Sequence, residues 1–261
     1  MTIDLKGLNA VVGGSTRGLG LAIANQLAAC GANVVIMARN PEKLSQAKAS
    51  LPQNGGQQHD SLEVDFYDFS HFQKVTQDYF RDRRIDILVN NTNGPSAGTV
   101  MEKKVEDFQE AFDLLFKSYH HLTHLLLGNM VKQGFGRVIN VSSSSVKEPI
   151  PNLVLSNSIR MAVISWAKSL SREVGAKGVT VNNILTGSFD TERIQEVLGS
   201  QAEKQEVPME DLMREKIKKI PAARLGKPEE YGYLAAFLAS PYAAYINGVS
   251  IPIDGGYLNS L

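Results

Sequence analysis

The stretch "VVGGSTRGLGLAIANQLAACGANVVIMARN", residues 11–40, decides the fold. It starts and ends with continuous apolar runs, and such runs without polar alternation predict strands buried on both faces of a sheet. Between the runs, apolar residues recur at helical spacing over residues 19–29. Gly14, Gly18 and Gly20 join the first strand to that helix, and the free amides at a helix start attract negative charge. The stretch therefore predicts a strand–helix–strand unit with an anion-binding turn; a merely tight turn is the alternative.

The same alternation continues along the chain. Further strands are predicted at 33–39, 62–66, 85–91, 136–143, 179–185 and 249–254, after a first strand at 9–14. Further helices are predicted at 103–130, 156–175 and 228–239, with Gly31 and Gly178 as stop signals. Residues 51–60 are predicted to form a surface loop. This order predicts an α/β fold over residues 1–261: a single-domain, Rossmann-type, doubly wound parallel sheet of about seven strands flanked by helices.

The composition excludes several classes of function. The 261 residues contain 27 Lys plus Arg and 27 Asp plus Glu, so we expect no nucleic acid and no membrane partner. We expect a small molecule bound in a pocket instead. The N-terminus lacks a secretory pattern, no apolar stretch approaches the roughly 20 residues that span a bilayer, and Cys30 is the only cysteine. A cytoplasmic location is therefore expected.

Several motifs carry a resemblance to a known family. The spacing Gly14-x-x-x-Gly18-x-Gly20 resembles the glycine motif of the short-chain dehydrogenase/reductase family, and "DILVNNTNG" resembles the family's Asn-Asn-Ala-Gly stretch. The other similar segments are "GRVINVSS", "VTVNNILTGSFDT" and "IPAARLGKPEEYGYLAAFLASPYAAYINGVSIPIDGG". The chain is identified as a member of this family and most resembles a divergent, 3-oxoacyl-acyl-carrier-protein-reductase-like branch. The resemblance implies an oxidoreductase that interconverts a carbonyl and an alcohol with a nicotinamide cofactor.

The second strand indicates which cofactor is preferred. A carboxylate at its end would accept hydrogen bonds from a ribose 2′-hydroxyl, but Arg39 stands there and Arg17 lies in the glycine loop. Two guanidinium groups can hold a 2′-phosphate, so NADP(H) is predicted in preference to NAD(H). Ordinary surface arginines are the alternative.

The resemblance also implies the residues that hold the cofactor. They are Gly14, Ser15, Thr16, Arg17, Gly18, Leu19, Gly20, Arg39, Asp65, Phe66, Asn91, Thr92, Arg160, Gly187 and Thr191. Asp65 and Phe66 would border the adenine, and Gly187 and Thr191 would hold the nicotinamide amide. Thr186 occupies the position of the family's usual proline, so the loop before Gly187 is less constrained in φ.

The catalytic positions depart from the family pattern. The family's serine falls on Ser143, but its tyrosine position holds Ser156, its lysine position holds Arg160 and its asparagine position holds Leu115. A phenol near a lysine can donate a proton, whereas a serine hydroxyl is a weaker acid on a shorter side chain. Arg160 keeps its charge and can hold a ribose or stabilise negative charge, but it cannot relay a proton. Ser156 would donate a hydrogen bond or hold a water molecule.

Two readings follow from these exchanges. In the first, the chain is an NADP(H)-dependent oxidoreductase whose Ser143 polarises the substrate oxygen. Losing a general acid costs typically about 10²–10⁴-fold, so a slow reductase is physically possible. In the second, the chain is a catalytically inactive nucleotide-binding sensor or assembly protein on the same fold.

Other groups near these positions are candidate proton donors. Lys147 follows Ser143 by four residues, with Glu148 beside it, and Tyr119 lies one helical turn beyond Leu115. Lys147, or water held by Ser143 and Ser156, is the predicted proton source; a solvated loop charge is the alternative reading of Lys147.

The remaining expectations concern the lid, the metals and the assembly. The polar segment 190–220 is predicted to be a substrate-covering lid, with Leu185, Phe189 and Met213 either lining the pocket or packing. His120 and His124 have helical spacing but lack a third ligand, so no metal site is expected. The resemblance implies a homo-oligomer, a tetramer or dimer, formed through the helices at 103–130 and 156–175.

Overall fold

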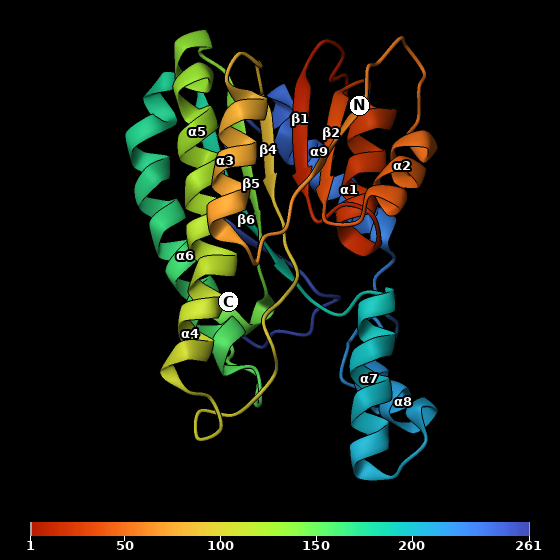
Figure 1. Cartoon of the computed structure of the whole chain (residues 1–261). Helices are drawn as coiled ribbons and strands as arrows, with labels where there is room; N and C mark the ends of the chain where they lie inside the picture. The colour runs from red at the N-terminus through yellow and green to blue at the C-terminus, as the bar shows by residue number, and fades with distance from the viewer. Residues whose placement is uncertain (1, 261) are drawn as a thin grey trace.

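Seven parallel strands form one sheet at the centre of the protein, which is described over residues 2–260 by a computed structural model (Figure 1). The strands are β1 (Asn9–Gly13), β2 (Asn33–Ala38), β3 (Asp60–Glu63), β4 (Ile87–Asn90), β5 (Gly136–Val141), β6 (Val179–Thr186) and β7 (Ser250–Ile253). Their order, β3-β2-β1-β4-β5-β6-β7, reverses direction between β1 and β4. The carboxyl ends of β1 and β4 therefore flank the crevice where this architecture binds ligands. The predicted doubly wound sheet is confirmed.

Helices cover both faces of the sheet (Figure 1). The α-helices are α1 (Gly18–Ala29), α2 (Pro41–Ser50), α3 (Phe69–Phe80), α4 (Val105–Ala111), α5 (Ser118–Gln133), α6 (Val154–Val174), α7 (Glu192–Gln205), α8 (Met209–Lys218) and α9 (Pro228–Ala239). One buried apolar cluster joins the sheet to α1, α2 and α9, and a second joins it to α3, α5 and α6. The two clusters therefore place α1, α2 and α9 on one face of the sheet and α3, α5 and α6 on the other.

Two helices form at capping signals that the apolar periodicity did not reveal. Asn40 precedes Pro41, and its side-chain oxygen accepts a hydrogen bond from Lys43 N at 2.8 Å, so α2 begins there. Asp68 accepts from His71 N at 3.0 Å and starts α3. The third strand was predicted at 62–66, which is wrong by two to three residues, because the chain leaves the sheet after Glu63.

The continuous helix predicted at 103–130 is also wrong. A π-helical segment, η1 (Phe112–Lys117), separates α4 from α5. The hydroxyl of Ser118 donates to the carbonyl of Asp113 at 2.9 Å, and its backbone N–H points to the same carbonyl. The wider turn therefore keeps its backbone groups satisfied in the interior.

A ladder of side-chain amides crosses the interior of the sheet. Asn90 donates to Asn140 at 2.9 Å, Asn140 donates to Asn183 at 2.9 Å, and Asn183 donates to Ser250 at 3.2 Å. These residues are register partners on four adjacent strands. Since the three asparagines are almost fully buried, the bonds fix strand register at a place where unpaired amides would be costly.

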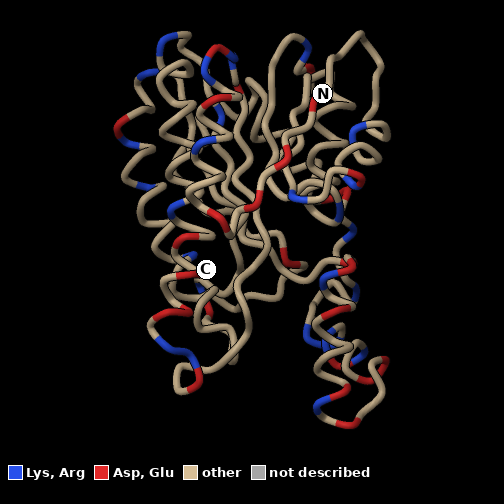
Figure 2. Tube along the Cα trace, in the orientation of Figure 1, with Lys and Arg blue, Asp and Glu red and all other residues tan. Residues whose placement is uncertain are grey.

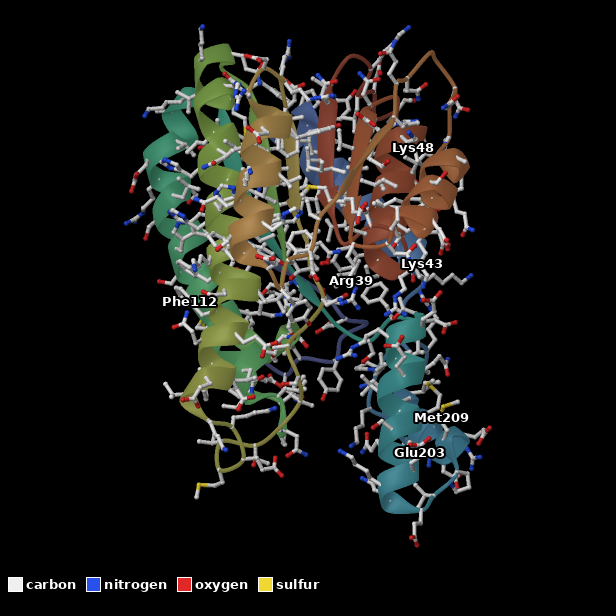
Figure 3. All side chains as sticks on the ribbon, viewed as in Figure 1. Arg39, Lys43, Lys48, Phe112, Glu203 and Met209 are labelled. Carbon is white, nitrogen blue, oxygen red and sulfur yellow. The ribbon has the colours of Figure 1, made fainter. Side chains whose placement is uncertain are left out.

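The segment predicted to cover the substrate folds as α7 and α8, which project from the body of the protein (Figure 1). Glu203 and Met209 mark its far end in Figure 3. Lysines, arginines and carboxylates are interspersed along it, as they are over the rest of the molecule (Figure 2). Within residues 2–260, no helix combines the length and apolarity needed to cross a membrane.

Candidate active site

The glycine loop leaves no room for side chains where it turns from β1 into α1. Gly14 and Gly18 have φ values of +53° and +54°, which favour glycine. A Cβ on Gly20 would meet the Gly14 carbonyl oxygen and would lie 2.8 Å from Asn91 Nδ2. The loop therefore brings bare backbone to the N-terminus of α1, which is the arrangement that receives a pyrophosphate.

Asn91 and Ser15 hold this loop in place. Asn91 Nδ2 donates to the carbonyls of Gly13 and Gly14 at 2.9 and 3.2 Å. The fully buried Ser15 donates its hydroxyl to Val12 O at 2.7 Å and accepts from Met37 N at 3.1 Å. The side chain of Ser15 is thus used to fasten the loop to β2, and it is directed into the protein.

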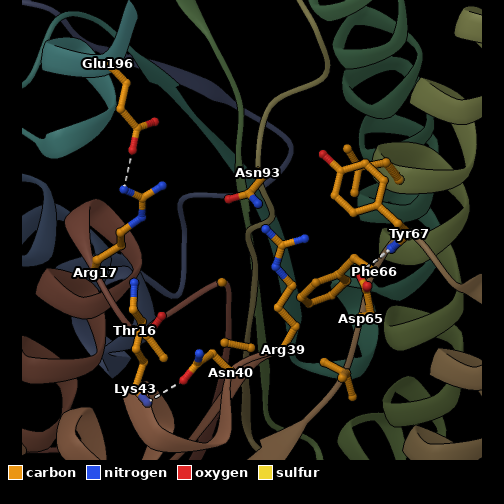
Figure 4. Close-up of a pocket in the computed structure, with 14 residues that line it drawn as sticks. Thr16, Arg17, Arg39, Asn40, Lys43, Asp65, Phe66, Tyr67, Asn93 and Glu196 are labelled. Carbon is orange, nitrogen blue, oxygen red and sulfur yellow. Dashed lines mark hydrogen bonds and ion pairs between the residues drawn. The ribbon is translucent and has the colours of Figure 1, made fainter.

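A cavity of about 390 Å³ opens beside the glycine loop (Figure 4). Its walls are the loop, the end of β2, the start of α2, the segment after β3 and one residue of α7. The lining residues are Gly14, Thr16, Arg17, Ala38, Arg39, Asn40, Lys43, Val64, Asp65, Phe66, Tyr67, Asn93, Leu114 and Glu196. It brings six of the predicted cofactor residues together, namely Gly14, Thr16, Arg17, Arg39, Asp65 and Phe66.

The two predicted arginines differ in their surroundings. Arg17 Nη1 binds Glu196 Oε1 at 2.6 Å and Glu192 Oε2 at 2.9 Å, so two carboxylates of α7 hold it (Figure 4). These hydrogen bonds raise the pKa of Arg17 above its ordinary value, and Arg17 lowers the pKa of Glu196. Among the described carboxylates, none forms a salt bridge with Arg39.

Lys43 supplies a further cation that sequence reasoning missed. It lies in the first turn of α2 and lines the cavity together with Arg39 (Figures 3 and 4). No described carboxylate forms a salt bridge with it. The Asn-Pro cap at residues 40–41 was the available signal, because it fixes Lys43 in the first turn of a helix, three residues beyond Asn40 and five beyond the end of the second strand. The wall at the end of β2 therefore carries two positive charges that have no salt-bridge partner among the described carboxylates.

The segment after β3 forms the opposite wall. Asp65 accepts from Tyr67 N at 3.0 Å, and the ring of Phe66 is buried against Phe72 at a centroid distance of 5.0 Å. Thr92, which is also buried, follows β4 next to Asn91. That these residues border an adenosine stays a prediction.

The catalytic serine position follows β5. Ser143 is partly exposed, and its Oγ accepts from Ser145 N at 3.1 Å at the start of a 3₁₀ turn. Because the backbone N–H uses an acceptor site, the hydroxyl proton of Ser143 remains available for a substrate oxygen. Ser156 is half-buried in the first turn of α6.

Arg160 is buried and bonds to the backbone. Its side chain is 8 % exposed, and Nη1 donates to the carbonyl of Val141 at 2.6 Å, with the Tyr119 hydroxyl 3.4 Å from the same oxygen. That carbonyl ends β5, two residues before Ser143. Arg160 therefore places a positive charge at the end of β5, close in sequence to Ser143, and its guanidinium is hydrogen-bonded to a backbone carbonyl.

The loop with Lys147 is tied to the C-terminal segment. Lys147 is exposed, while Glu148 Oε1 accepts from Asn259 N and Ser260 N, both at 2.8 Å. The N–H of Ser260, together with that of Asn259, lowers the pKa of Glu148. Glu148 thus holds the C-terminal segment with its carboxylate. Because its pKa is lowered, Glu148 is ionised at neutral pH and has no proton to donate.

The segment after β6 returns to the glycine loop. Gly187 N donates to Ile253 O at 3.1 Å, and a Cβ on Gly187 would lie 2.5 Å from the Cα of Asp254. A Cβ on Gly18 would meet Thr191 at 3.7 Å. Thr191, one of the two predicted nicotinamide residues, therefore lies next to the predicted phosphate loop, whereas Gly187 packs against the end of β7.

Several other candidate side chains are accounted for by contacts with their neighbours. Leu115 and Leu185 are fully buried, and Phe189 packs edge-on against Tyr231 at 5.3 Å. His120 and His124 stack at 5.9 Å on an exposed helix face. Over residues 2–260, no group of three or more His, Cys, Asp or Glu side chains is arranged to hold a metal ion.

Comparisons with known proteins agree with this geometry. The family model described as enoyl-(acyl carrier protein) reductase matches residues 14–258. A 3-oxoacyl-[acyl-carrier-protein] reductase of Haemophilus influenzae is 31 % identical over 97 % of this chain and 98 % of its own. The 2-dehydro-3-deoxy-D-gluconate 5-dehydrogenase of Bacillus subtilis is 30 % identical over 98 % of this chain and 96 % of its own.

Solved structures extend the comparison. The L-sorbose reductase of Gluconobacter frateurii, complexed with NADPH and L-sorbose, superposes with a TM-score of 0.93 at 28 % identity over the full length of both chains. The NADPH-dependent reductase YwfH, involved in bacilysin biosynthesis, superposes with a TM-score of 0.91 at 28 % identity over 97 % of this chain and 99 % of its own.

Proposed function

Because the chain belongs to the short-chain dehydrogenase/reductase family, on a 3-oxoacyl-acyl-carrier-protein-reductase-like branch, we propose that this oxidoreductase uses NADP(H) to interconvert a carbonyl and an alcohol. The observation that carries the cofactor preference is the pair of cations, Arg39 and Lys43, which line the cavity beside the glycine loop and have no salt-bridge partner among the described carboxylates. Two such groups favour a 2′-phosphate over a 2′-hydroxyl. The NADPH-bound and NADPH-dependent neighbours support the same choice.

The cofactor would lie along the carboxyl end of the sheet. Gly14, Gly18 and Gly20 would let the α1 amides receive the pyrophosphate, Arg39 with Lys43 would hold the 2′-phosphate, and Thr191 would reach the nicotinamide amide. Ser15 and Asn91 would act through the loop that they fasten. When bound, the nicotinamide supplies a hydride to the substrate carbon.

Ser143 and Arg160 would serve the substrate oxygen. Ser143 would donate its free hydroxyl proton as a hydrogen bond, and the buried charge of Arg160, behind the Val141 carbonyl, would stabilise negative charge developing on that oxygen. Ser156 would hold a water molecule near Ser143. Lys147 or that water would supply the proton.

The assembly and the lid belong to the same proposal. Helices α7 and α8, in the segment 190–220, would cover the substrate side of a single domain. Phe116, His120 and Trp166 form a partly exposed aromatic face on η1, α5 and α6, with ring centroids 5.8–6.4 Å apart. We propose that this face meets a second copy of the chain, and that the protein works in the cytoplasm.

One observation favours a second candidate function. The position of the family's tyrosine holds the short side chain of Ser156, and Arg160 is directed at a backbone carbonyl. A protein that binds NADP(H) without turnover, as a redox sensor or an assembly partner, would need neither a phenol nor a free lysine.

Titrations of the purified protein with NADPH and NADH test the cofactor. Each charged hydrogen bond to phosphate contributes about 1.5–3 kcal/mol, so Arg39→Ala and Lys43→Ala should each weaken NADPH binding by roughly 10–100-fold and leave NADH binding unchanged. Lys48→Ala, further along α2 and 4.0 Å from Asp60, is the matched control and should change neither affinity. Equal affinities of the unmodified protein for NADPH and NADH would contradict the preference.

Turnover separates the two candidate functions. NADPH absorbance is followed with sugar ketones, 3-oxoacyl thioesters and simple ketones as substrates. Oxidation of NADPH with any of them establishes the reductase. Tight NADPH binding without oxidation across the panel supports the binding protein, and no nucleotide binding at all contradicts both.

A further inference from the structure

A buried phenol faces the residue that replaces the family's proline. The hydroxyl of Tyr231, on α9, lies 3.0 Å from Thr186 Oγ1 and 3.4 Å from the carbonyl of Ile184. Tyr231 has no exposed surface, whereas Thr186 is half-buried at the last position of β6. The two bonds can be satisfied together if Thr186 donates to Tyr231 and Tyr231 donates to Ile184.

The phenol is suited to a hydrogen bond and is unsuited to acid catalysis. Burial raises the pKa of Tyr231 above its ordinary value, while the hydrogen bond with Thr186 and the charge of Arg160 oppose that rise without cancelling it. Tyr231 therefore stays neutral at physiological pH. Its ring is also held by Phe189, at a centroid distance of 5.3 Å, so its position is well fixed.

The contact between Tyr231 and Thr186 lies at the start of segment 187–191, whose backbone conformation would affect cofactor binding. A proline fixes φ through its ring, whereas a threonine does not. Thr186 directly precedes Gly187, whose amide donates to Ile253 O, and the following chain runs to Thr191 beside Gly18. A movement at Thr186 would therefore be transmitted to the whole segment 187–191.

We infer that Tyr231 and Thr186 form a hydroxyl brace, which replaces the absent proline in positioning the nicotinamide-binding segment 187–191. Both are positioning residues, since neither needs to touch the cofactor. The inference rests on the proposed function only in assuming that segment 187–191 holds the nicotinamide end of NADP(H). If segment 187–191 adopts its binding-competent conformation less often, the apparent affinity for the cofactor falls by the same fraction.

The experiment measures the NADPH dissociation constant by titration and the stability by thermal unfolding, and neither requires turnover. Tyr231→Phe removes only the hydroxyl and should weaken NADPH binding about three- to tenfold. Thr186→Val removes the partner hydroxyl and should have a similar effect. The double variant should be no weaker than either single one, because both break the same contact.

Two further variants separate the brace from a general loss of stability. Tyr79→Phe removes a phenol that donates to Asp60 at 2.6 Å, far from segment 187–191, so it should lower the melting temperature without changing NADPH binding. Thr186→Pro added to Tyr231→Phe should restore the affinity to within about twofold of the unmodified protein.

Each outcome decides the matter. Unchanged NADPH affinity in Tyr231→Phe and Thr186→Val, with or without a lower melting temperature, overturns the brace. An affinity that proline fails to restore overturns the replacement of proline. An unmodified protein that binds no NADPH defeats the proposed function itself, which the variants would not do.

Discussion

Gly20→Ala tests whether the glycine loop needs the close approach seen in the structure. An alanine Cβ would lie 2.8 Å from Asn91 Nδ2 and 2.9 Å from the Gly14 carbonyl carbon, and the Gly14 oxygen would be nearer still. Ordinary contacts between heavy atoms are about 3.5–4.0 Å, so the loop must move by roughly 1 Å. Such overpacking costs about 1–3 kcal/mol, which exceeds the roughly 0.5–1 kcal/mol that alanine gains over glycine in a helix.

The expected result is a loss of about 1–2 kcal/mol in the free energy of unfolding, measured in urea, and at least about tenfold weaker NADPH binding. Gly128→Ala is the matched control, because Gly128 is exposed in α5 and its Cβ would meet nothing within 4 Å. That variant should be stabilised by about 0.5–1 kcal/mol with unchanged affinity. If Gly20→Ala matched Gly128→Ala in both measurements, the argument from close approach would be refuted.

Three shorter predictions concern charge, pH and register. Glu196→Gln removes one carboxylate from Arg17 and should tighten NADPH binding about two- to fivefold at low salt and less at high salt; weaker binding would mean that the ion pair helps to hold the cofactor. Burial lowers the pKa of His121, whose Nε2 lies 2.9 Å from Thr76 Oγ1, so unfolding takes up protons and stability should fall as the pH drops below the ordinary value of 6.5. His121→Gln should flatten that pH dependence of the free energy of unfolding, measured in urea. An unchanged pH dependence would mean that other groups cause it. Asn140→Leu removes the hydrogen bonds to Asn90 and Asn183, which keep their bonds to Thr123 and Ser250, and should cost roughly 1–3 kcal/mol in urea unfolding; an unchanged free energy of unfolding would contradict a stabilising role of the ladder.

The fold and the glycine loop could be predicted because their signals are local. Apolar runs at 9–14 and 179–185 needed no knowledge of distant residues, and the observed strands agree with them to within one residue. The break in the helix at 103–130 could not be predicted, because a π turn depends on how Ser118 and Asp113 meet in the folded chain.

The site was predicted less completely, since side-chain direction is set by tertiary contacts. The position of Arg39 follows from strand counting, but the capture of Arg17 by α7 depends on where a projecting helix returns. Lys43 was hidden because a lysine in a helix is ordinarily a solvated charge. The inward direction of Arg160 could not be predicted, because its partner, the Val141 carbonyl at the end of β5, lies 19 residues earlier in the chain and is reached only in the folded protein.

The exchange of lysine for arginine at position 160 has a physical consequence for the proposed reaction. A lysine ammonium is a compact point charge, whereas a guanidinium can bond a backbone carbonyl with one N–H and keep four others. Arg160 can therefore remain anchored at Val141 while its charge stays behind Ser143, in a buried position where charge acts strongly. In the proposed reduction this charge would favour the developing oxyanion, so the proton could arrive late and from water. We expect a reductase built this way to depend less on the acidity of a protein group, and its turnover to depend strongly on the hydrogen bond that keeps Arg160 in place.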